Sequence, residues 1–115
     1  MAYIDGFVMA VPAAKKQAFL ETTALWAKYV KELGATRVVQ TWGDDVPEGK
    51  LTDFRRAVAA EDGEIVSFGW AEYPTKAARD AAKAKMQADD RMKHMEMPFD
   101  GRRMIFGGFD SLVEL

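Results

Sequence analysis

The chain of 115 residues contains no cysteine and only one histidine, His94. The absence of cysteine excludes disulfide bonds, thiolate metal sites and a cysteine nucleophile. A single histidine with scattered carboxylates lacks the clustered ligands that zinc or iron sites need. There is also no glycine-rich phosphate loop and no Gly-x-Ser-x-Gly motif. We therefore expect no metal and no cofactor.

The sequence also lacks a strong charge of one sign and a long apolar run. Its formal net charge of −2 gives no field that would attract nucleic acid or an anionic membrane. No apolar run approaches the roughly 20 residues of a membrane span, and Asp5 stands where a signal peptide would be basic. We expect a soluble cytoplasmic protein with one domain, residues 1–115, because this length with 49% apolar residues suits one core.

The apolar periodicity predicts alternating strands and helices. Strands are predicted at residues 3–11, 36–42, 53–60, 64–73 and 103–109. Helices are predicted at 13–33, with Gly34 as the C-terminal cap, and at 76–88, with Thr75 as the N-cap. Residues 88–101 are predicted to be an irregular linker. The order β-α-β-β-β-α-β indicates an α+β fold.

The predicted strands carry more apolar surface than two helices can cover. The first strand is apolar on both faces, and large apolar groups occur along the sheet at Trp42, Phe54, Phe68, Trp70, Phe106 and Phe109. Two helices cover one face only, so we expect the other face to pack against a second copy of the chain. The pair Gly107-Gly108 predicts a bend or a close approach in the last strand.

Four segments carry a family resemblance: YIDGFVMAVP, RVVQTWGDDVPEGKLTDFRRAV, SFGWAEYPTKAARD and MPFDGRRMIFGGF. Together they resemble the YbaA-like family, a domain family of unknown function within the dimeric α/β-barrel superfamily. The resemblance covers nearly the whole chain. It implies a ferredoxin-like fold, with two helices on one face of an antiparallel sheet, whose sheets pair between subunits into a barrel. It implies no particular reaction, because that superfamily includes cofactor-free monooxygenases, haem-handling enzymes, dehydratases and ligand-sensing regulators.

Candidate ligand-binding residues come from the predicted strands. On a strand at 53–60, Arg55 and Arg56 point to opposite faces, so one of them is directed into an enclosed space. A buried guanidinium needs a carboxylate partner, for which Asp5 and Glu72 are candidates, or an anionic ligand. Both possibilities stay open. Trp42 and Trp70 either line an apolar cavity or pack in the core.

The polar linker offers one further candidate. His94 has the side chain of a general base, but no orienting partner is evident, and a surface position explains it equally simply. The methionines around the linker are adaptable packing groups or a lid over the barrel; they are Met86, Met92, Met95, Met97 and Met104.

Three functions fit these observations. The first is binding or conversion, without a cofactor, of a small hydrophobic or anionic organic molecule in the barrel, with Trp42, Arg55, Arg56, Trp70 and His94 as binding residues. The second is a non-catalytic interaction homodimer. The third is RNA binding through the arginine pairs, which the acidic net charge disfavours. The residues assign no catalytic group and leave open whether the protein is an enzyme.

Overall fold

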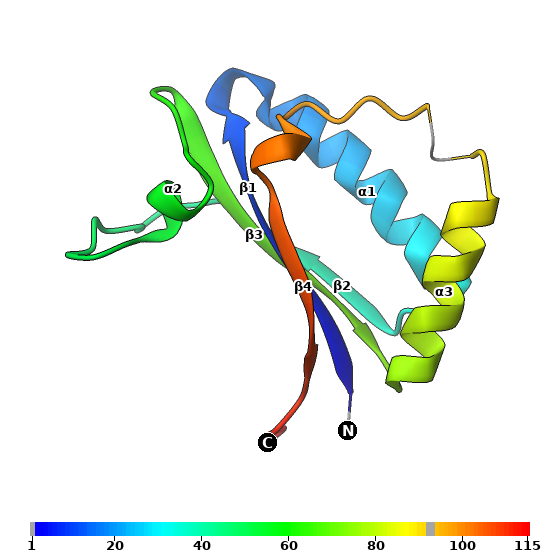
Figure 1. The fold of residues 1–115 in the computed structure, drawn as a ribbon. Coiled ribbons are helices and arrows are strands. Elements are labelled where there is room, and N and C mark those ends of the chain that lie inside the picture. Colours follow the sequence, from blue (N-terminus) through cyan, green and yellow to red (C-terminus); the bar gives the residue numbers. More distant parts are fainter. Residues whose placement is uncertain (1, 92–93) are drawn as a thin grey trace.

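The computed structural model describes residues 2–91 and 94–115 and has an α+β fold (Figure 1). One open antiparallel sheet has the strand order β2-β3-β1-β4. The strands are β1 (Tyr3–Pro12), β2 (Arg37–Gln40), β3 (Glu64–Tyr73) and β4 (Ile105–Asp110). The helices are α1 (Lys16–Leu33), α2 (Phe54–Ala57) and α3 (Lys76–Ala88), with 3-10 turns η1 (Ala13–Lys15) and η2 (Gly101–Arg103). In the described part of the chain, no helix is long and apolar enough to cross a lipid bilayer.

The two long helices end and begin where the sequence predicts. Gly34 closes α1 with a φ of 131°, a conformation that only glycine adopts without strain, and its N–H donates to the Lys31 carbonyl. The Thr75 hydroxyl accepts a hydrogen bond from the Ala78 N–H and so caps the start of α3. Both cap predictions are confirmed.

β1 is a central strand and fixes the register of the sheet. It pairs with β3 from Tyr3↔Tyr73 to Pro12↔Glu64, and with β4 from Tyr3↔Asp110 to Val8↔Ile105. The short β2 pairs with the other edge of β3, from Arg37↔Glu72 to Gln40↔Gly69. Because side chains alternate along a strand, the odd-numbered residues of β1 and β3 all point to one face.

That face is covered by α1 and α3, which lie on the same side of the sheet (Figure 1). One core cluster joins both helices to the sheet and contains Tyr29, Val30, Ala35, Ala71, Tyr73 and Ala82. A second cluster, nearer the N-terminal half of α1, contains Met9, Val11 and Phe19. The helices therefore shield one face of the sheet, as predicted.

The predicted strand at 53–60 is wrong. Asp53 caps a short helix instead, because its carboxylate accepts a hydrogen bond from the Arg56 N–H at 2.8 Å. The Arg56 guanidinium bonds the Asp53 carboxylate and the carbonyls of Leu51 and Gly49. These local bonds satisfy polar groups of the loop backbone, so the loop does not pair with a neighbouring strand. A short apolar alternation cannot tell a strand from one helical turn.

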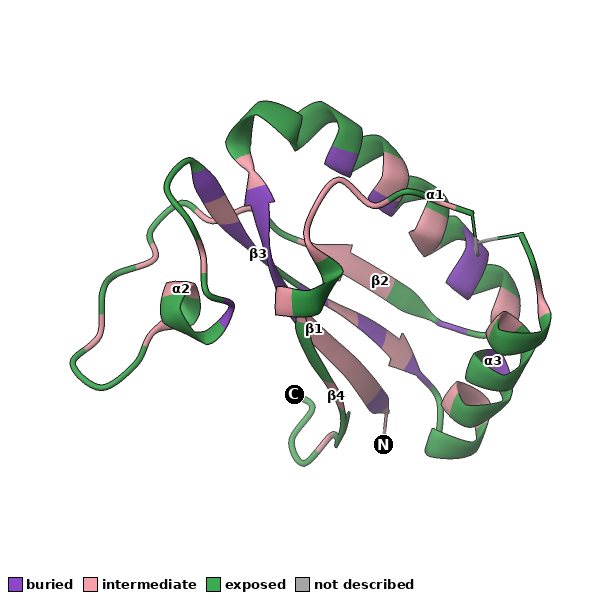
Figure 2. Ribbon diagram, turned by 45° about the horizontal axis from the view of Figure 1, so that its top comes forward, coloured by how far each residue is buried: buried purple, intermediate pink, exposed green. Residues whose placement is uncertain are grey.

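Residues 43–60, here called the arm, project from the sheet on the side opposite α1 and α3 (Figures 1 and 2). Val58 is buried at the base of the arm and packs with Val8, Ala10 and Val66 on the sheet. The arm therefore covers only the end of this second face that lies next to the start of β3.

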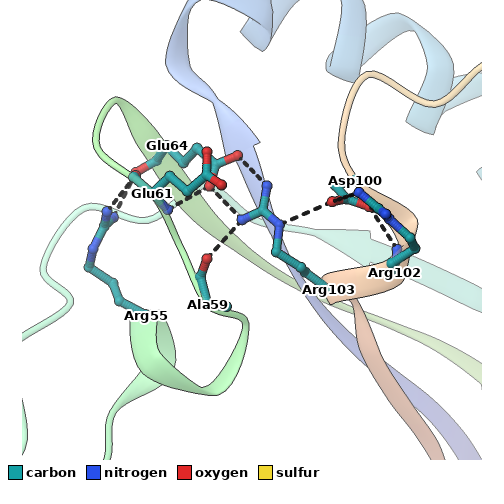
Figure 3. A network of polar contacts seen from close by, with 7 residues as sticks. All are labelled: Arg55, Ala59, Glu61, Glu64, Asp100, Arg102 and Arg103. Atoms are coloured by element: carbon teal, nitrogen blue, oxygen red, sulfur yellow. Dashed lines mark hydrogen bonds and ion pairs between the residues drawn. The ribbon is translucent and has the colours of Figure 1, made fainter.

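Arg103 connects the base of the arm to β3 through hydrogen bonds and an ion pair (Figure 3). Its guanidinium binds both carboxylate oxygens of Glu64, at 2.7 and 2.8 Å, and donates to the Ala59 carbonyl at 2.9 Å. Arg55 donates to the carbonyls of Glu61 and Glu64. Hydrogen bonds from Arg103 hold the pKa of Glu64 down to about 2.

The rest of the second face, here called the open face, is apolar and uncovered in the single chain. It comprises the side chains of Ile4, Phe68, Trp70, Ile105 and Phe109. Phe68 is 43% exposed and Phe109 is 61% exposed. Figure 2 shows β4 exposed along most of its length.

The Glu64–Arg103 pair predicts a stability difference that depends on pH. Replacing Glu64 by Gln should lower the free energy of unfolding at pH 7 by about 2 kcal/mol. The folded pKa of Glu64 is about 2 and its ordinary value is 4.5. Its contribution is therefore complete above about pH 5 and is lost as the pH falls toward 2. Urea unfolding of both proteins between pH 7 and pH 3 measures the difference.

Glu61→Gln is the control for this prediction, because the Glu61 side chain is exposed and lies in the same turn. Its stability should follow that of the unmodified protein at every pH. A Glu64→Gln variant whose deficit is the same at pH 7 and pH 3 would contradict the assigned pairing.

Candidate functional site

A cleft of about 470 Å³ lies between the helix-facing side of the sheet and the helices α1 and α3, and we call it the sheet–helix cleft. Its aromatic lining comprises Phe7, Phe19, Trp26, Phe99 and Phe106. Its methionines are Met9, Met86, Met97 and Met104. A largely apolar cleft of this size with few polar groups is typical of a small-molecule site.

Small residues of α3 and β4 border this space. Ala82 is the one buried residue within α3, so this helix brings little bulk toward the sheet. Across the cleft, β4 contributes Gly107 and Gly108. A side chain at Gly108 would overlap the ring and hydroxyl of Tyr3. The ladder between β1 and β4 contains no extra residue, so the glycine pair does not form a bulge. Gly108 makes room for the Tyr3 ring, whereas a side chain at Gly107 would meet Phe109 on the open face.

The polar groups of the cleft gather at the end formed by β1 and α3. Arg79 donates from Nη1 to Asp5 Oδ1 at 3.0 Å and from Nη2 to the Tyr3 hydroxyl at 3.1 Å. The guanidinium carbon lies 4.7 Å from the centroid of the Tyr3 ring, which adds a cation–π contact. Arg79 is thereby fixed in orientation at the wall of an apolar space.

Burial raises the pKa of Asp5 above its ordinary value, and Arg79 and Lys83 offset only part of this effect. Asp5 Oδ1 receives the Arg79 hydrogen bond. A carboxylate with a raised pKa accepts a proton more readily than an ordinary aspartate does. Such perturbed groups in clefts are frequent at functional sites.

Lys83 adds a second positive charge to this end of the cleft. It forms no ion pair with any residue that the structure describes. Arg79 pairs with both Asp5 and Asp80, whereas the exposed Lys83 acts on Asp5 through its charge without forming an ion pair with a described residue. This end of the cleft is therefore suited to an anionic group of a ligand.

A second cleft, of about 560 Å³, lies under the N-terminal half of α1 beside β2, and we call it the edge cleft. Trp42 forms part of its wall, with the Trp42 ring centroid 6.1 Å from that of Phe19. The ammonium of Lys16 lies 5.3 Å from the centroid of the Trp42 ring. Phe19, Thr23 and Gln40 line both clefts.

The structure does not bring the five predicted binding residues together. Trp42 lines the edge cleft, whereas Trp70 lies on the open face, where its Nε1 donates to Glu72 at 2.9 Å. Arg55 and Arg56 lie on α2 and bond the arm and its base. His94 is exposed in the linker between α3 and η2.

The predicted partners of the arginines are also different. Asp5 does pair with an arginine, but that arginine is Arg79 on α3. Glu72 lies 3.8 Å from Arg37 and accepts a hydrogen bond from Trp70. The expectation of an ion pair between Asp5 or Glu72 and Arg55 or Arg56 is therefore wrong, because these arginines are not on a strand.

The residues that sequence reasoning missed are Arg79, Lys83 and Thr23. One signal was available: Asp5 interrupts an otherwise apolar strand, so a buried partner for it was to be expected. Nothing in the local pattern of α3 separates Arg79 and Lys83 from its other cations. Met86, Met97 and Met104 do line the cleft, whereas Met92 lies outside the described residues.

Among residues 2–91 and 94–115, no group of three or more histidine, aspartate or glutamate side chains is placed to hold a metal ion. The chemistry of the sheet–helix cleft is that of its apolar lining and of Asp5, Arg79 and Lys83.

Comparison with known proteins places the chain in a family. Residues 2–101 match the family described as "Protein of unknown function (DUF1428)". The chain is 57% identical over 116 aligned residues to "Uncharacterized protein YbaA" of Escherichia coli strain K12, with 99% of each chain covered. The protein of the same name from Shigella flexneri matches with the same identity and coverage. The chain thus belongs to the DUF1428 family, whose YbaA members it resembles over their full length.

Proposed function

We propose that this chain is a homodimer that binds a small organic acid in the sheet–helix cleft without a cofactor. The observation that carries the proposal is the presence of Lys83, a cation with no ion-pair partner among the described residues, at one end of an apolar cleft. An acid with an apolar body would bury that body against the aromatic and methionine side chains and place its carboxylate at Lys83.

This proposal places the ligand on the helix side of the sheet, not between two sheets as the sequence suggested. Most of the wall of the cleft is built from strands and long helices, which hold side chains more rigidly than loops do, and the segment before β4 contributes Met97, Phe99, Gly101 and Met104. Arg79 is held by Asp5 and Tyr3 and gives that end of the cleft a fixed hydrogen-bonding geometry.

For the assembly, we infer that the open face packs against the same face of a second copy. Phe68, Ile105 and Phe109 form an exposed apolar patch beside Trp70. Patches of this kind mark interfaces, and two-fold dimers bury the same patch on both subunits. The exposed Phe54, whose ring centroid lies 6.3 Å from that of Phe68, extends the patch onto the arm.

The strand order and the family resemblance support the finer description of the fold. With α1 and α3 on one face, we infer that the order β2-β3-β1-β4 is the ferredoxin-like arrangement. Pairing through the open face would then join two sheets into a dimeric α/β barrel. A cytoplasmic location is part of the same proposal.

A second candidate function is a non-catalytic interaction homodimer. The open face favours it, because a large apolar surface explains a dimer without any ligand. In that case the cleft would bind no ligand. The two candidates therefore differ in whether Lys83 binds the carboxylate of an acid.

Replacing Lys83 by Ala should weaken binding of aromatic carboxylic acids about tenfold, since a charge-assisted hydrogen bond is lost. Binding of the corresponding neutral amides should change little. Isothermal titration with phenylacetate, naphthoate and their amides measures both. Lys85→Ala is the matched control, because Lys85 is on the same helix and does not line the cleft. Equal affinity in the two variants, or no binding of any acid, would favour the interaction homodimer.

Replacing Phe68 by Asp should convert the dimer into a folded monomer, because Phe68 is 43% exposed in the single chain and would be buried only at the interface. Sedimentation velocity at micromolar concentration, together with circular dichroism, measures this. Leu25→Asp is the control, since Leu25 is 60% exposed on α1, on the helix side of the sheet, and this variant should stay dimeric. A monomeric unmodified protein would overturn the proposed assembly.

A further inference from the structure

The sheet–helix cleft and the edge cleft adjoin each other beneath α1. Phe19, Thr23 and Gln40 line both of them, so the two spaces lie on opposite sides of a wall only one side chain thick. The first cleft is about 470 Å³ and the second about 560 Å³. Each lies within the range that small organic ligands occupy, and a ligand that used both would have to be elongated.

Thr23 is the smallest of the three residues in this wall. Gln40 is held by a hydrogen bond from its Nε2 to Ser67 Oγ at 2.6 Å. The Phe19 ring is held between Trp42 and Phe99, with centroid separations of 6.1 and 5.9 Å. A passage between the clefts would therefore run past Thr23.

The charges lie at the ends of this path and not along it. Asp5, Arg79 and Lys83 stand at one end, and Lys16 stands at the other beside Trp42. The wall itself carries no ionisable side chain. The Lys16 ammonium lies over the Trp42 ring, 5.3 Å from its centroid, so the anionic end of a ligand is assigned to Lys83 and its long uncharged body to the rest of the path.

We propose that the two clefts together bind a linear aliphatic carboxylic acid. The carboxylate lies at Lys83, and the chain passes Thr23 and ends against Trp42 in the edge cleft. A methylene chain is thinner and more flexible than a fused-ring body, so it needs a narrower gap beside Thr23. The methionines that line the first cleft are flexible and adapt to such a chain. This inference rests on the proposed function and specifies its ligand class.

The test is a chain-length series of saturated fatty acids from six to sixteen carbons, titrated below their micelle concentrations. Each buried methylene raises affinity by roughly twofold to fourfold. If the chain enters the edge cleft, affinity should keep rising beyond eight carbons, and the fourteen-carbon acid should bind at least roughly tenfold more tightly than the eight-carbon acid.

The key variant is Ala24→Trp, which fills the edge cleft from an exposed position on α1. It should remove most of the gain between eight and fourteen carbons and leave eight-carbon binding unchanged. Leu25→Trp is the matched control, because Leu25 is the exposed neighbour and lines neither cleft. Thr23→Leu adds bulk between the two clefts and should lower the ratio of the fourteen-carbon to the eight-carbon affinity, while Thr23→Val, of similar size, should keep this ratio. The ratio is the readout because Thr23 also lines the sheet–helix cleft.

The outcomes separate this inference from the function on which it rests. If acids bind in a Lys83-dependent way but affinity stops rising at eight carbons, or if Ala24→Trp behaves like Leu25→Trp, the shared channel is wrong and the proposed function stands. If no acid of any length binds, both fail.

Discussion

The constraint on which this structure depends is that its sheet is apolar on both faces while its two long helices lie on one. α1 and α3 bury the odd-numbered residues of β1 and β3, and the arm covers only one end of the opposite face. Phe68 and Phe109 are left substantially exposed on that face. Burying such side chains is worth about 25 cal/mol per Å² of apolar surface, so a second surface that covers them gains a large driving force. The proposed dimer follows from this imbalance.

The same packing creates the cleft on the helix side. α3 has a buried face built on alanine, so this helix does not fill the space between itself and the sheet. Protein interiors are otherwise densely packed, so an unfilled space lined by Asp5 and Arg79 is unusual. Burying this pair lowers stability compared with an apolar filling, and the raised pKa of Asp5 reflects that loss. This is the physical reason for regarding the cleft as functional.

Arg55 and Arg56 lie away from the sheet–helix cleft for one reason. Arg55 and Arg56 were assigned to a strand, whereas Asp53 caps a turn of helix there and both guanidinium groups bond carbonyls of the arm or its base. The cationic residues that line the cleft are Arg79 and Lys83 on α3. In the sequence, nothing distinguishes them from the other cations of this alanine-rich and lysine-rich helix. A side chain's direction is decided by how its helix packs, and local pattern does not contain that information.

The sequence by itself determined the long elements, since β3 and α3 have the predicted bounds and the caps at Gly34 and Thr75 are where local chemistry requires them. It also determined that the sheet has too much apolar surface for its helices. Those properties depend on neighbouring residues and on composition. The tertiary structure alone decided the pairing of Asp5 with Arg79, which are 74 residues apart in the chain, and the clefts beneath α1. A short segment indicates that Asp5 needs a partner, but which residue pairs with it and where the clefts lie depend on the spacing between layers, which is set by the packing of side chains that are distant in the sequence.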